Sequence, residues 1–142
     1  MFGPSARWRL CRGGSRGGRL LLSGAIVGAV FVYAGVSKVL SGKRWPQAAR
    51  QLGVPPAVAY TVMVAEVVVG LGVVLGGTWQ QGFLAAAAVM LLAFTLLLAV
   101  RMRDAERPPC ACFGATKQRP IGSRDIVRNV SLLVLVMVAF VS

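Results

Sequence analysis

Histidine is absent from the sequence, and acidic residues are scarce: four Asp and Glu stand against 16 Lys and Arg in 142 residues. The lack of histidine removes the commonest metal ligand and the commonest general base. Any chemistry must therefore use cysteine, carboxylate, amine, guanidinium, phenol or backbone groups. Charged residues of both signs make up only 14% of the chain, whereas a soluble domain has about 25%. This shortage excludes an ordinary water-soluble domain.

The uncharged parts of the sequence are long apolar runs. A membrane-spanning helix needs about 20 mostly apolar residues. Four stretches approach this length, namely Leu20–Leu40, Ala57–Leu75, Gly82–Val100 and Ser123–Val141. We therefore predict an all-α fold, a polytopic four-helix bundle in the cell (inner or plasma) membrane. The length suits one domain, placed at residues 20–142 after a flexible basic tail at residues 1–19.

The net charge of +12 would suggest a nucleic-acid partner in a soluble protein. Here the cations lie between and outside the apolar runs, where basic residues contact lipid head groups. The Arg-Gly-rich run at residues 12–19 has only two short repeats and leads directly into the first span. We therefore expect the lipid bilayer, and no nucleic acid, as the partner of these cations. Glycine and serine separate the arginines of the tail, so no stable helix is predicted before Leu20.

The first two spans carry small residues and basic ends. Gly24 and Gly28 in the first span, and Gly70 in the second, allow close approach of neighbouring helices. Lys38 lies near the end of the first span, where its long stem can reach the interface. Residues 41–56 are interpreted as a polar loop, with Trp45 suited to the membrane interface.

Glu66 is the one carboxylate within the core of a predicted span. An ionisable group at that depth is costly, and it usually faces the bundle interior or a watery cavity. Two interpretations remain open. Glu66 is either a neutral, hydrogen-bonded side chain that holds helices together, or a functional group that handles protons or pairs with a cation near the cysteines.

Cys110 and Cys112 form the only close cluster of reactive side chains, in a loop between the third and fourth spans. Two thiols one residue apart can close a small, strained disulfide ring, and strain raises the reduction potential. The cations Arg107, Lys117 and Arg119 favour the thiolate form. A metal site needs about four ligands, and this loop supplies two thiolates and no histidine. Redox chemistry is therefore favoured over a metal site and over inert thiols.

The number of spans fixes which loops share a face of the membrane. The tail and residues 76–81 lie on one face, and residues 41–56 and 101–122 lie on the other. Cys11 is thereby separated from the cysteine pair. The residues brought toward the same half of the bilayer are Lys38, Glu66, Cys110, Cys112, Arg128 and Asn129.

Basic residues are more numerous on the cysteine face. The tail carries five arginines, whereas ten Lys and Arg flank the spans on the cysteine face. The positive-inside rule would place the cysteines in the cytoplasm on this count.

Five segments together resemble the MauE family of methylamine-utilisation membrane proteins, which is grouped with DoxX-like proteins. The resemblance extends over residues 20–142. The segments are Tyr33-Ala34-Gly35-Val36-Ser37-Lys38, Leu52-Gly53-Val54-Pro55, Ala65-Glu66 with Gly70, Cys110-Ala111-Cys112-Phe113-Gly114, and Arg128-Asn129.

The resemblance implies a four-helix inner-membrane protein that supports maturation of a disulfide-rich, exported protein. In the namesake that client is the methylamine dehydrogenase small subunit, and a thioredoxin-like partner is implied. The family role favours an extracytoplasmic cysteine loop, in opposition to the charge count. We expect Cys110 and Cys112 as the redox pair, supported by Glu66 and by Lys38, Arg128 and Asn129.

The electron sink is not identified by the sequence. A quinone is possible in a membrane, but no quinone-specific motif is present, and the cofactor is unknown. The alternative function is a non-enzymatic membrane subunit or small transporter, in which Glu66 and Lys38 line a polar path. The absence of a repeat or a broken-helix pair of the transporter kind lowers this alternative.

Overall fold

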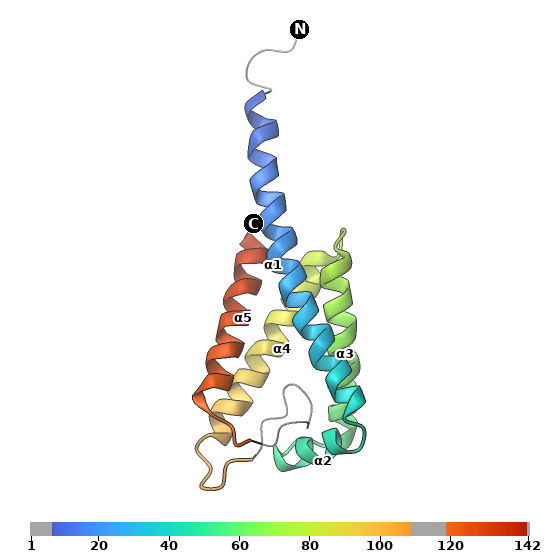
Figure 1. The fold of residues 1–142 in the computed structure, drawn as a ribbon, viewed down its shortest axis with the longest axis vertical. Coiled ribbons are helices and arrows are strands. Elements are labelled where there is room, and N and C mark those ends of the chain that lie inside the picture. The colour runs from blue at the N-terminus through green and yellow to red at the C-terminus, as the bar shows by residue number, and fades with distance from the viewer. Residues whose placement is uncertain (1–6, 109–118, 142) are drawn as a thin grey trace.

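The computed structural model describes residues 7–108 and 119–141, apart from the side chains of residues 7–17, 19 and 20. These residues form five helices: α1 (Arg7–Leu40), α2 (Arg44–Gln51), α3 (Pro56–Leu75), α4 (Gln80–Arg101) and α5 (Ser123–Val141). The four long helices pack lengthwise, and the short α2 lies across one end of them (Figure 1). This arrangement confirms the predicted all-α four-helix bundle.

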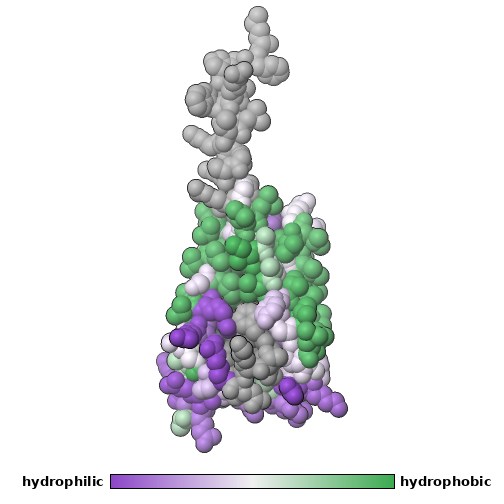
Figure 2. Space-filling view, viewed as in Figure 1, coloured by the Kyte–Doolittle hydropathy of each residue, from purple (hydrophilic) through white to green (hydrophobic). Residues whose placement is uncertain are grey.

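Within the described residues, three helices are long and apolar enough to cross a membrane: residues Leu21–Leu40 of α1, all of α3 and all of α4. Large apolar side chains on their outer faces are exposed, and Tyr33 on α1 and Val89 on α4 are each about two-thirds accessible. A band of hydrophobic residues covers the bundle in Figure 2, and hydrophilic residues gather at the α2 end. Such an exterior fits lipid rather than water, so the chain is an integral membrane protein.

α5 keeps its predicted bounds but differs from the other long helices in charge. Arg124, Asp125 and Arg128 all lie in its first two turns. Its remaining turns are apolar, and Leu132, Val136 and Ala139 face the bundle interior. The polar end of α5 therefore lies at the same end of the bundle as α2 (Figure 1).

α1 begins much earlier than the sequence predicted. Its backbone is helical from Arg7, so the prediction of no stable helix before Leu20 is wrong. Extending an existing helix adds one hydrogen bond for each residue fixed, whereas starting a helix is the unfavourable step. Growth backwards from the apolar span therefore carries the helix through glycines that would prevent it from starting alone.

α2 corrects the interpretation of residues 41–56 as a polar loop. Trp45, Ala48, Ala49 and Leu52 recur at the spacing of one helix face, and all four are buried. The polar residues of the same segment point outward. The segment is thus a short amphipathic helix that closes one end of the bundle.

Two apolar clusters fill the interior. The bundle core contains Val27 and Phe31 of α1 with residues of α3, α4 and α5. The second, here called the end cluster, comprises Trp45, Ala48, Ala49, Leu52, Ala59, Leu98 and Ile121.

The end cluster joins the two polar segments that connect α1 to α3 and α4 to α5. Arg101 Nε donates a hydrogen bond of 3.0 Å to the Leu52 carbonyl, and Ile121 N–H donates one of 3.1 Å to the Pro108 carbonyl. The ends of the connection between α4 and α5 therefore lie beside α2, as the count of spans predicted.

α1 and α3 approach each other closely at Gly28 and Gly70. A Cβ atom at Gly70 would lie 2.8 Å from Val32 N and 2.9 Å from Gly28 O, both of them backbone atoms. Backbone cannot move aside as a side chain can, so a methyl group there pushes the helices apart. The predicted role of these glycines in close packing is confirmed.

We expect Gly70→Ala to lower the free energy of unfolding by about 1–3 kcal/mol, the usual cost of overpacking a well-packed contact. Gly82→Ala on α4 is the matched control, because a Cβ atom there meets nothing within 4 Å. Reversible unfolding in mixed micelles measures both variants. Equal stability of the two variants would contradict the close-packing role of Gly70.

Candidate functional site

A buried ion pair joins α1 to α3 near the α2 end of the bundle. Lys38 Nζ lies 2.6 Å from Glu66 Oε1 and 2.5 Å from Oε2. The side chains of Lys38 and Glu66 are only 1% and 3% exposed. The expectation that Lys38 extends to the interface is therefore wrong, because its ammonium turns inward to the carboxylate. Each charge compensates the other where neither is exposed to bulk water.

Two aromatic rings complete the surroundings of the ammonium. Lys38 Nζ lies 4.9 Å from the centre of the Trp45 ring and 5.6 Å from that of Phe94. Both distances are within the range of cation–π attraction. The Trp45 indole is itself fixed, because its Nε1–H donates a hydrogen bond of 3.1 Å to the Ala59 carbonyl. Trp45 is thus a buried wall of the site rather than an exposed interfacial anchor.

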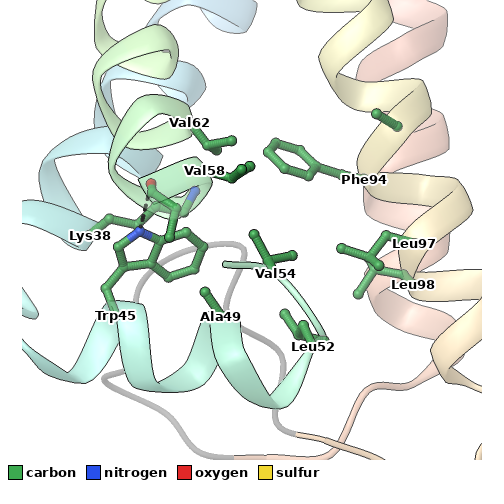
Figure 3. A pocket seen from close by; sticks show the side chains of 12 residues that line it. Lys38, Trp45, Ala49, Leu52, Val54, Val58, Val62, Phe94, Leu97 and Leu98 are labelled. Atoms are coloured by element: carbon green, nitrogen blue, oxygen red, sulfur yellow. Dashed lines mark hydrogen bonds between the residues drawn. The ribbon is translucent and has the colours of Figure 1, made fainter. Parts of the chain in front are cut away.

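An apolar pocket of about 230 Å³ opens beside the ion pair, between α2, α3 and α4. Trp45 and Phe94 lie on opposite sides of it, and Leu52 and Leu97 line the part nearer the end cluster (Figure 3). Val58, which also lines it, is about half exposed on the outer surface of α3. The pocket is therefore open toward the lipid side, and Lys38 is the one charged residue among the described residues that line it.

A much smaller cavity of about 30 Å³ lies on the other side of the pair. Glu66 and Asn129 line it together with apolar residues of α1, α4 and α5. Asn129 is only 4% exposed. The structure therefore places Asn129 and Glu66 at the same cavity.

Arg128 belongs to a different group, at the start of α5. Its Nη2 lies 3.6 Å from Asp125 Oδ1, and Arg119 Nη2 lies 3.5 Å from the same oxygen. Asp125 is 2% exposed, and its Oδ2 accepts a hydrogen bond of 3.1 Å from Gly122 N–H. The carboxylate thus satisfies a backbone donor at the helix start, where negative charge is also favoured by the helix dipole. Arg128 therefore belongs to the group around Asp125, whereas the adjacent Asn129 lines the cavity with Glu66.

Cys110 and Cys112 lie outside the described residues. The described residues on either side of their segment are anchored, because Ile121 is 1% exposed within the end cluster and bonds to Pro108. The segment thus starts and ends at the α2 end of the bundle. α1 extends beyond the opposite end (Figure 1), and Cys11 is part of that extension.

Sequence reasoning missed two residues of this site. The role of Trp45 was recoverable, since Trp45, Ala48, Ala49 and Leu52 mark the buried face of an amphipathic helix. Phe94 gave no signal, because it is one apolar residue among many in α4.

A model of the family described as methylamine utilisation protein MauE matches residues 19–142, which is most of the chain. No curated protein and no solved structure matches this chain.

Proposed function

Because the chain belongs to the MauE family, we propose that this membrane protein is a thiol–disulfide relay that supports maturation of exported proteins. Cys110 and Cys112 are its redox pair. When their thiols form a disulfide, they lose two electrons and two protons, and the disulfide of a thioredoxin-like partner gains them to become two thiols. In the reverse direction the partner's thiols reduce the Cys110–Cys112 disulfide.

The observation that carries this proposal is the location of the Cys-X-Cys motif between two anchored points. Pro108 and Ile121 hold the ends of its segment at the polar end of the bundle. Arg107 and Arg119 lie next to that segment and are exposed. Their positive charges favour the thiolate, which is the form that attacks a disulfide.

The membrane helices act as the frame for this loop. In the proposal α5 is the fourth span, and the protein lies in the cell (inner or plasma) membrane. The Lys38–Glu66 pair holds α1 against α3 near the α2 end of the bundle. Trp45 packs over the pair and joins it to the end cluster, in which Ile121 is also buried. The client is an exported, disulfide-containing protein, and the family name points to methylamine utilisation.

The alternative of a small transporter needs Glu66 and Lys38 to line a polar path. In the structure these two groups bind each other, and the adjoining pocket is apolar apart from Lys38. No observation favours the transporter over the relay.

Thiol labelling tests both the redox state and the sidedness of the loop. The probe is a membrane-impermeant maleimide applied to intact cells with and without prior reduction, in a Cys11→Ser background. We expect labelling of Cys110 and Cys112 to rise after reduction, which reports an extracytoplasmic disulfide. Labelling only after the cells are permeabilised would contradict the extracytoplasmic placement. A level unaffected by reduction in both intact and permeabilised cells would contradict the relay.

A further inference from the structure

Asn129 is a buried polar residue whose Nδ2 lacks a hydrogen-bond acceptor within the described part of the chain. Its side chain is almost fully enclosed, and Nδ2 has no hydrogen-bond partner among the described residues. A buried donor left in this state costs about 1–3 kcal/mol. Native structures rarely retain such a donor without a water, an ion or a functional reason. The feature therefore points to a ligand.

The cavity that Asn129 shares with Glu66 has the size for one small molecule. Its volume of about 30 Å³ exceeds the minimum that a single water needs, roughly 10–15 Å³. Its other lining residues are apolar, among them Phe31, Leu91 and Phe94. An ion would lose its hydration shell among these apolar walls. Water is the ligand that suits both the volume and the two polar walls.

Glu66 has acceptor capacity to spare. An ionised carboxylate has about four lone-pair positions, and the hydrogen bonds from Lys38 use one position on each oxygen. A water molecule in the cavity can therefore donate to Glu66 while it accepts from Asn129 Nδ2. Both partners that a buried water requires are supplied by these two side chains.

We propose that this cavity is a binding site for one ordered water molecule that bridges Asn129 of α5 to Glu66 of α3. The bridge connects the ion pair of α1 and α3 to a third helix. α5 is then fixed relative to the Glu66 carboxylate, and Ile121, the downstream anchor of the cysteine segment, lies just before α5. Asn129 is a positioning residue for Glu66 in this account. The inference does not depend on the thiol chemistry.

Water-to-carboxylate magnetisation transfer in solid-state NMR tests the bridge in the full-length protein in lipid bilayers. The chain has only two glutamates, Glu66 and Glu106, so ¹³C-glutamate labelling of a Glu106→Gln protein isolates the Glu66 carboxyl signal. We expect rapid transfer from water to Glu66 in this protein. Transfer should be lost in Asn129→Leu, which removes the donor, and retained in Asn129→Ser, which keeps a hydroxyl.

A second variant separates the loss of water from a failure to fold. Ala34→Val adds two methyl groups at the cavity wall and leaves both polar partners in place. We expect it to lose the transfer as Asn129→Leu does. Absence of transfer in the Glu106→Gln protein, or transfer in Asn129→Leu and Ala34→Val as rapid as in the Glu106→Gln protein, would overturn the proposal.

Discussion

Lys38→Met or Glu66→Leu alone should lower the free energy of unfolding by about 3–5 kcal/mol, because each leaves one buried charge without its partner. The side chains are 1% and 3% exposed, so bulk water cannot replace the lost partner. In the double variant no charge remains, and the two apolar side chains suit the surrounding residues. We expect it to recover most of the loss, since a buried pair replaced by apolar residues is often neutral or stabilising.

Unfolding of the two single variants, the double variant and the wild type forms a double-mutant cycle that isolates the coupling between the two residues. Asp104→Asn is the matched control, because Asp104 pairs with Arg101 at 3.2 Å on an exposed surface. Such a pair contributes about 0–1 kcal/mol. If the single variants lowered the free energy of unfolding as little as Asp104→Asn does, the two buried charges would not stabilise each other.

Cys110→Ser and Cys112→Ser should each abolish the maturation of the exported client, whereas Cys11→Ser should leave it intact. A relay needs both thiols to form and reopen its disulfide, so the loss of either stops turnover completely. Serine is close to cysteine in size and forms no disulfide, so the effect reports chemistry rather than packing. The readout is the fraction of exported client protein that carries its correct disulfides.

Each single variant should also accumulate a mixed disulfide. The remaining thiol attacks the partner's disulfide, and no second thiol is present to release it. The product is visible as a reducible adduct of higher mass on a non-reducing gel. Client maturation that survives both substitutions would contradict a role for the pair. It would leave the MauE family assignment, which rests on the chain as a whole, unaffected.

The long helices were predictable because long apolar runs leave one strong signal in a sequence. α3 was expected at Ala57–Leu75 and is found at Pro56–Leu75, and the bounds expected for α5 are those observed. Hydropathy also placed Glu66 inside a span. Hydropathy could not show which residue pairs with Glu66. Lys38 lies 28 residues away in the sequence, so no local sequence pattern links the two. That pairing depends on how α1 and α3 rotate against each other.

The wrong predictions concern residues whose positions are set by contacts between helices rather than by the local sequence pattern. The polar residues of α2 suggested a loop, although the spacing of Trp45, Ala48 and Ala49 already indicated a helix face. Lys38 was expected to reach the interface because its position in sequence is near the end of a span. The structure shows instead that the Trp45 ring lies beside the Lys38 ammonium and that the Glu66 carboxylate binds it. Asn129 gave no sign of its cavity, since the cavity exists only where α5 meets α1, α3 and α4.

Redox cycling of Cys110 and Cys112 in membranes tests the central claim most directly. Cells expressing the Cys11→Ser protein are treated briefly with an oxidant or a reductant, quenched with acid, and labelled with a thiol reagent that adds mass. We predict that the cysteine pair changes between reduced and oxidised forms and returns to its initial state after the treatment is removed. A pair that stays in one state throughout would contradict the thiol–disulfide relay.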